Sequence, residues 1–180
     1  MELKGTRTEQ NLYSTFSSEA RARTKYNLYA ERARVDGYQW VAEIFDVSAQ
    51  YELAHAREVL RRHLNLIGNT RDNLLDSFLE ESKEGQNIYR QFEEEARQEG
   101  FIVIANYFKE LANAEEEHAN TFKELYDKIE DGTMFRGPEG SLWICMNCGY
   151  IYEGVEAPLV CPLCRYPRAY FKPYERVSNA

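Results

Sequence analysis

The stretch Ala114-Glu115-Glu116-Glu117-His118 decides the fold that we expect for this chain. It lies in a segment whose apolar residues recur at helical spacing, namely Ile104, Phe108, Leu111, Phe122, Leu125 and Ile129. Glu115 and His118 fall on that apolar stripe, so a carboxylate and an imidazole are expected to face the interior of a helical protein. Burying an unpaired carboxylate is costly, and a partner of opposite charge must therefore offset the cost.

Three other segments with helical periodicity also place metal-ligating residue types on their apolar stripe. They are residues 12–33 with Glu19, residues 41–59 with Glu52 and His55, and residues 74–92 with Glu81 and, one turn later, Glu84. A glutamate from each of two helices plus a Glu-x-x-His pair from each of two others is the ligand set of a four-helix bundle holding two iron or manganese ions. One such pair alone also fits a solvated surface pair. Five glutamates and two histidines in register favour the dinuclear site.

The spacing of these residues indicates a duplicated helix pair. Glu19 and Glu52 are 33 residues apart, and Glu81 and Glu115 are 34 apart. We expect helices over about 7–35, 38–66, 71–99 and 101–130, with Gly68 ending the second helix. His63 lies beyond the apolar stripe and is expected at the surface. The third helix is expected to be continuous.

Composition places the chain among acidic globular proteins. Its 180 residues are 43% hydrophobic and 29% charged, with a net charge of −8. This charge argues against nucleic-acid binding, and no segment is apolar enough to cross a membrane or to act as a signal core. A cytoplasmic location is the default expectation. All four cysteines lie within 20 residues, which in a reducing compartment favours metal binding over disulfides.

Helical periodicity ends in the Gly- and Pro-containing segment 133–141, which we interpret as a linker between a domain over 1–132 and a domain over 142–180. The C-terminal domain carries Cys145-x-x-Cys148 and Cys161-x-x-Cys164, separated by twelve residues. Two such pairs bring four thiolates into a tetrahedron that suits one iron or zinc ion. The spacing does not distinguish a redox-active iron from a structural zinc ribbon.

The residues around the cysteines add a family resemblance. Gly149-Tyr150-Ile151-Tyr152-Glu153-Gly154, the Cys161-Pro-Leu-Cys164 pair and Phe171 resemble rubredoxin, the one-iron electron carrier. Together with Ser18-Glu19-Ala20-Arg21, the two Glu-x-x-His pairs and Glu81-x-x-Glu84, the whole chain resembles the rubrerythrin family. The expected fold is mainly α, a ferritin-like four-helix bundle followed by a small rubredoxin-like β/loop domain.

This resemblance implies a set of roles for the ligands. Glu52 and Glu115 would bridge two irons, which are oxo- or hydroxo-bridged when oxidised. Glu19 would be terminal on the first iron, and Glu81 with His118 would hold the second. Glu84 and His55 match the positions at which the family exchanges a glutamate for a histidine when the site is reduced. Phe101 stands where we expect a tyrosine that tunes one bridging carboxylate.

The resemblance also implies an activity, the reduction of hydrogen peroxide to water, with electrons passing from a reductase or rubredoxin through the four-cysteine iron. The same ligands suit two alternatives, a ferroxidase or dioxygen-reducing oxidase and an iron-storage or zinc-ribbon binding protein. The connection between the second and third helices is short for a ferritin-like bundle. We therefore expect a homodimer in which the two protomers exchange helix pairs.

Overall fold

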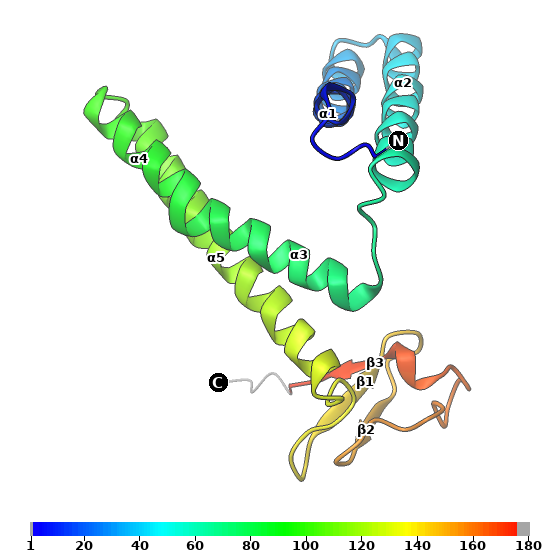
Figure 1. Cartoon of the computed structure of the whole chain (residues 1–180). Helices are drawn as coiled ribbons and strands as arrows, with labels where there is room; N and C mark the ends of the chain where they lie inside the picture. The colour runs from blue at the N-terminus through cyan, green and yellow to red at the C-terminus, as the bar shows by residue number, and fades with distance from the viewer. Residues whose placement is uncertain (1, 176–180) are drawn as a thin grey trace. The chain divides into compact units, whose positions relative to one another are not determined.

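The computed structural model of the chain describes residues 2–175, and it consists of two compact units, residues 1–69 and 70–180 (Figure 1). The expected mainly α fold with a small C-terminal strand-and-loop domain is confirmed. The predicted domain limits at residue 1 and at residues 176–180 lie outside the described residues. Within the described range no helix combines the length and the apolarity needed to span a membrane.

The first unit is an antiparallel pair of helices, α1 (Arg7–Val35) and α2 (Gln39–Glu58). The Thr6 side chain caps α1 by accepting a hydrogen bond from the Glu9 backbone N–H at 3.1 Å. The buried residues between the helices are small: Ala30 and Ala33 of α1, and Ala42, Ala49 and Ala56 of α2. Alanines at seven-residue spacing let the two backbones approach closely along their whole length.

The end of the second helix differs from the prediction. It finishes in a π-helical turn, η1 (Val59–His63), in which the Leu64 N–H donates to the Val59 carbonyl. The left-handed residue that follows is Asn65, at φ 52°, and not Gly68. Asparagine enters this conformation more readily than most residues, so the chain turns three positions earlier than expected. His63 is exposed, as predicted.

The second unit contains the other helix pair and the C-terminal module. The predicted continuous third helix is wrong in one respect. It consists of α3 (Thr70–Lys83) and α4 (Tyr89–Gln98), joined by a π-helical turn, η2 (Glu84–Ile88). This composite helix packs against α5 (Ile102–Glu130), whose buried residues are Ala105, Ala112 and Ala119.

The two helix pairs repeat one another with a single shift. The alanines, glutamate and histidine of α2 recur in α5 at an offset of 63 residues, as in Ala49 and Ala112. Along the other helix the offset is 62 up to Glu19 and Glu81, and 63 from Tyr26 and Tyr89 onward. The second pair therefore contains one extra residue between these points. The π-helical turn, which widens a helix by one residue, lies in that interval.

The C-terminal module is a three-stranded antiparallel sheet in the order β2-β1-β3, made of β1 (Leu142–Cys145), β2 (Ile151–Glu153) and β3 (Phe171–Pro173), with a short 3-10 turn, η3 (Arg168–Tyr170), before β3. Trp143, Cys145, Ala157, Cys161 and Phe171 form its core. The segment expected as a linker is tied to this module. The Gly137 N–H donates to the Val155 carbonyl at 2.8 Å, and Arg136 pairs with Glu156.

Candidate metal centres

The first glutamate–histidine cluster is formed between α1 and α2. Glu19, Glu52 and His55 bring one ligand atom each to within 4.8 Å of one another. His55 Nδ1 lies 3.0 Å from Glu52 Oε2 and 3.9 Å from Glu19 Oε2. A hydrogen bond shared with Glu52 raises the pKa of the Glu19 carboxyl, and partial burial adds to the increase. Two carboxylates this close call for a proton or a cation between them.

The second cluster repeats this geometry between α3 and α5. Glu81, Glu115 and His118 also bring their ligand atoms within 4.8 Å of one another. His118 Nδ1 lies 2.6 Å from Glu115 Oε2 and 3.8 Å from Glu81 Oε2. Partial burial raises the pKa of Glu81, and the hydrogen bond and charge of Glu115 raise it further. Each helix pair thus assembles a half-site of two carboxylates and one imidazole.

Glu84 joins the second half-site through a tyrosine. Glu84 opens η2 and is half-buried, and its charge raises the pKa of Glu81 as a lesser contribution. The Tyr89 hydroxyl donates to Glu84 Oε2 at 3.1 Å. Burial raises the pKa of Tyr89, and Glu84, Glu115 and Glu81 add to it, so the phenol stays protonated as a donor.

Sequence reasoning missed Tyr89 and looked for a tyrosine at Phe101 instead. Phe101 is the N-cap of α5, fourteen residues before Glu115 and so about 21 Å away along the helix. Tyr89 is five residues after Glu84, a spacing that brings side chains together only where the helix is widened. The signal that was present is the difference between the 33- and 34-residue glutamate separations.

The four cysteines converge on one point in the C-terminal module. Cys145 Sγ lies 3.7 Å from Cys164 Sγ, and Cys148 Sγ lies 3.7 Å from Cys161 Sγ. A metal–sulfur bond of about 2.3 Å in a tetrahedron gives sulfur–sulfur edges of about 3.8 Å, so the cluster has the size of a tetrahedral iron or zinc site. Nothing here resembles a disulfide.

The backbone around the cysteines distributes their acidity unevenly. The N–H of Tyr166 lowers the pKa of the Cys164 thiol to about 6, with help from Asn147. For Cys148 the N–H of Tyr150 lowers the pKa, but desolvation and the three neighbouring thiols outweigh it and raise the pKa to about 12. Four thiolates at these distances repel one another, and a bound cation removes that repulsion.

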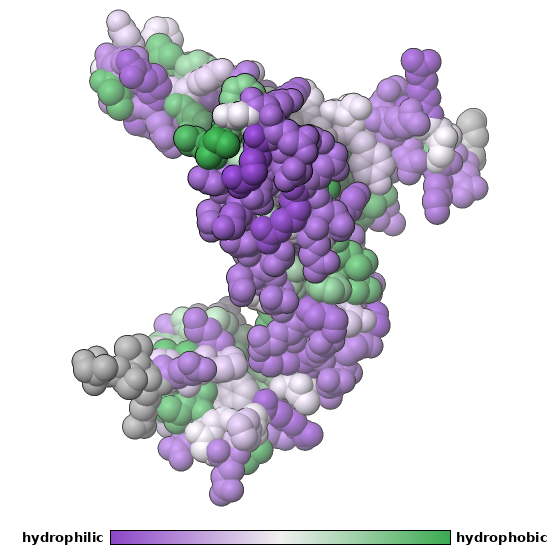
Figure 2. Space-filling view, turned by 90° about the vertical axis from the view of Figure 1, so that its left-hand side faces the viewer, coloured by the Kyte–Doolittle hydropathy of each residue, from purple (hydrophilic) through white to green (hydrophobic). Residues whose placement is uncertain are grey.

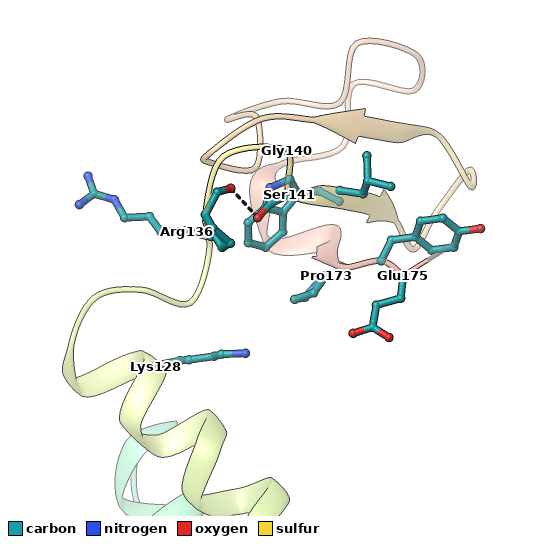
Figure 3. A pocket seen from close by; sticks show the side chains of 11 residues that line it. Lys128, Arg136, Gly140, Ser141, Pro173 and Glu175 are labelled. Atoms are coloured by element: carbon teal, nitrogen blue, oxygen red, sulfur yellow. Dashed lines mark hydrogen bonds between the residues drawn. The ribbon is translucent and has the colours of Figure 1, made fainter. Parts of the chain in front are cut away.

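The largest surface hollow lies apart from these ligands. It measures about 590 Å³ and is lined by Lys128 of α5, Arg136 and residues of the C-terminal module, including Ser141 and Glu175 (Figure 3). The Ser141 hydroxyl donates to the Pro138 carbonyl at 2.7 Å, which fixes the wall. Its lining contains no cluster of metal-ligating side chains, so the chemistry is expected at the three clusters.

Comparisons with known proteins agree with these sites. The "Rubrerythrin" family model matches residues 10–71 and 72–140, and the "Rubrerythrin, rubredoxin-like domain" model matches residues 143–172. The chain belongs to the rubrerythrin family. A rubrerythrin of Clostridium perfringens is 37% identical, with 96% of this chain and 97% of the relative covered. A rubrerythrin of Nitratidesulfovibrio vulgaris is 35% identical, with 94% and 95% covered.

Among solved structures, nigerythrin in a mixed-valence state is 26% identical, covers 96% of this chain and 89% of its own, and superposes with a TM-score of 0.36. The rubrerythrin family carries a diiron site and a four-cysteine rubredoxin-like site, which confirms the predicted cofactors. The donor atoms fit both. The individual roles of Glu19, Glu52, His55, Glu81, Glu84, Glu115 and His118, and of the four cysteines, remain predictions.

Proposed function

We propose that this rubrerythrin is a peroxidase that reduces hydrogen peroxide to water. Membership of the family points to an oxidoreductase. The observation that supports the finer activity is the second half-site, where Glu84 adds a third carboxylate held by Tyr89. When bound, two ferrous ions supply the two electrons that, with two protons, convert one hydrogen peroxide to two waters. The chain's own part is to hold the ligands and to keep Glu84 available.

The decisive test removes the Glu84 carboxylate. Glu84→Ala is expected to keep two irons in the helical region while peroxide turnover falls at least tenfold, because the other six ligands remain. Glu80→Ala, which removes an exposed carboxylate one turn earlier, is the matched control and should behave as wild type. Stopped-flow oxidation of the anaerobic diferrous protein by peroxide and by dioxygen measures both reactions. Unchanged turnover in Glu84→Ala, or faster oxidation by dioxygen, would contradict the proposal.

We further propose that electrons reach the diiron site through the four-cysteine iron, from a reductase or a rubredoxin. The tetrahedral spacing of the sulfurs fits a single iron, which accepts one electron at a time. Zinc occupies the same geometry without redox chemistry. Protein with zinc in the module and iron in the helices should therefore oxidise once when reduced in advance, but fail to turn over repeatedly with an external donor. Repeated turnover at the wild-type rate would exclude this route.

The third part of the proposal is a homodimer that exchanges helix pairs. The family is generally homodimeric. Six residues, 64–69, connect η1 to α3, and they span at most about 22 Å. Returning along half a bundle of about 15 Å on each side of the metals requires about 30 Å. The link is therefore too short to join α2 and α3 within one bundle of ferritin-like topology.

Exposed apolar residues support a dimer of this kind. Trp40, Ile44 and Tyr51 of α2 are 78%, 55% and 61% exposed, and Val103 and Tyr107 of α5 are 84% and 62% exposed. The surface is otherwise largely hydrophilic, with separate apolar patches (Figure 2). Light scattering of the iron-loaded protein should give a dimer. Adding about twelve Gly/Ser residues after Gly68 should allow a monomer that still binds two irons. An iron-loaded wild-type monomer would rule out the exchange.

A further inference from the structure

Gly85 is a glycine whose backbone conformation does not require one. It lies in η2, directly after Glu84, and it is buried. The glycines with positive φ are at other positions, such as Gly100 and Gly149, so Gly85 is not selected for a left-handed backbone. Glycine in a helix interior is destabilising relative to alanine. The reason for a glycine here must therefore lie in the space around it.

That space is closed by α5. A Cβ placed on Gly85 would lie 2.9 Å from Cγ of Glu116, 3.0 Å from the Ala112 carbonyl oxygen and 3.0 Å from the Glu116 backbone nitrogen. The first of these neighbours is a flexible side chain, but the other two are backbone atoms of a helix. Neither can move without moving α5. No side chain fits at position 85 unless η2 separates from α5.

The same contact is clamped by an arginine. Arg90, in the first turn after η2, donates from Nη2 to Asn113 Oδ1 and to Glu116 Oε1, both at 2.8 Å. The π-helical turn is thus held on α5 from its middle, by Gly85, and from its C-terminal side, by Arg90. Glu84 is at its N-terminal end, next to Gly85 and hydrogen-bonded to Tyr89. The point of closest approach on α5 includes Glu116, the neighbour of Glu115.

We propose that Gly85 is a positioning residue for Glu84: by carrying no side chain it lets η2 rest on the backbone of α5, and this contact sets where the Glu84 carboxylate lies relative to Glu81, Glu115 and His118. This inference rests on the proposed role of Glu84 as an iron ligand. It assigns to Gly85 no contact with iron or peroxide. Its effect acts through the placement of η2 alone.

The test compares Gly85→Ala with Glu84→Ala in the full-length, iron-loaded protein. In Gly85→Ala the added methyl group is expected to lift η2 from α5 and to displace the carboxylate. Two irons should remain bound, the absorption spectrum of the oxidised diiron site should change from that of wild type to that of Glu84→Ala, and peroxide turnover should fall at least tenfold. The spectrum and the iron content decide the inference even if the wild-type protein fails to reduce peroxide.

Ala105→Gly is the matched control. Ala105 is fully buried on α5, one heptad before Ala112, and its replacement weakens the helix without adding volume at η2. It should lower the melting temperature of the metal-free protein but keep the wild-type spectrum and turnover. A wild-type spectrum in Gly85→Ala would overturn the proposal, as would a change that Ala105→Gly reproduces.

A second variant covers the case in which Gly85→Ala does not fold. Arg90→Ala releases the clamp without adding volume. It is expected to shift the oxidised spectrum in the same direction as Glu84→Ala, by a smaller amount, with two irons bound. If Gly85→Ala fails to fold and Arg90→Ala keeps the wild-type spectrum, the placement of η2 does not control Glu84 and the inference is wrong.

Discussion

The two helix pairs share one plan and differ at one place. Both are lined by buried alanines at seven-residue spacing, and both hold a histidine near two glutamates, at 3.0 and 3.9 Å in the first pair and 2.6 and 3.8 Å in the second. At the position that corresponds to Glu84, the first pair has Ala22 in an unbroken α1. One added residue therefore separates a plain half-site from one with a further carboxylate.

The packing beside that position differs in the same way. In the first pair, Arg23, Leu53 and Ala56 line a hollow of about 380 Å³ between the helices. The corresponding positions in the second pair include Gly85 and Glu116, which are in close contact. The extra residue of η2 thus brings backbone against backbone where the first pair leaves space. The comparison suggests that the second pair carries the adjustable ligand and the first pair carries a simpler scaffold.

The largest expected effect concerns the two histidines, whose geometry is alike but whose proposed roles differ. His118→Ala removes a ligand in every state and should weaken iron retention by the oxidised protein roughly 100-fold, about 2.7 kcal/mol. His55→Ala should weaken it less than about tenfold, because Glu84 is proposed to serve the first iron in that state. Iron content during titration with a competing chelator measures both. Equal losses would show that the half-sites are used alike.

Much of this plan was readable from the sequence because it depends on periodicity. Glu115 and His118 on an apolar stripe, repeated by Glu52 and His55, predicted both half-sites, and two Cys-x-x-Cys pairs predicted the four-cysteine cluster. These patterns survive because helix spacing and knuckle spacing are local rules.

What the sequence did not reveal is where local rules give way to tertiary contacts. The register change at Glu84 replaces i, i+4 by i, i+5 hydrogen bonds, which residue types alone do not specify. Tyr89 was missed for this reason. Gly85 has no side chain to signal its importance, and only the distance to the Ala112 carbonyl explains it. The end of α2 at Asn65 was missed because Gly68 is the stronger local stop signal.

A smaller effect is expected from filling the two helix seams. Ala112→Leu should lower the free energy of unfolding of the metal-free protein by about 1–3 kcal/mol, because Ala112 is fully buried where Gly85 meets its carbonyl. Ala56→Leu should cost less than about 1 kcal/mol, because the added atoms can enter the 380 Å³ hollow. Urea unfolding at one fixed protein concentration compares them. A cost for Ala56→Leu as large as that for Ala112→Leu would mean that the hollow does not accept a side chain.

The smallest effect is expected at an ion pair that only the second helix pair has. Arg71, at the start of α3, makes a two-point ion pair with Glu130 at the end of α5, and its Nη2 donates to the Tyr126 hydroxyl at 3.2 Å. The corresponding positions in the first pair are Thr8 and Ile67. Arg71→Ala should lower the melting temperature at pH 7 by about 2 °C or less, because both side chains are exposed to solvent. Added salt should reduce the difference.

The pH dependence gives this prediction its sign. The hydrogen bond from Arg71 lowers the pKa of Glu130 below its unperturbed value of 4.5. A carboxyl group with a lowered pKa in the folded state stabilises the protein above its unfolded pKa, and loses that contribution as the pH falls through the folded value. The melting temperatures of wild type and Arg71→Ala should therefore differ constantly from pH 6 to 8 and converge below about pH 4.5. Arg32→Ala, which removes a local pair with Asp36 inside the first unit, is the control. If it lowers the melting temperature as much as Arg71→Ala does, tying the two ends of the second pair together adds nothing beyond an ordinary surface pair.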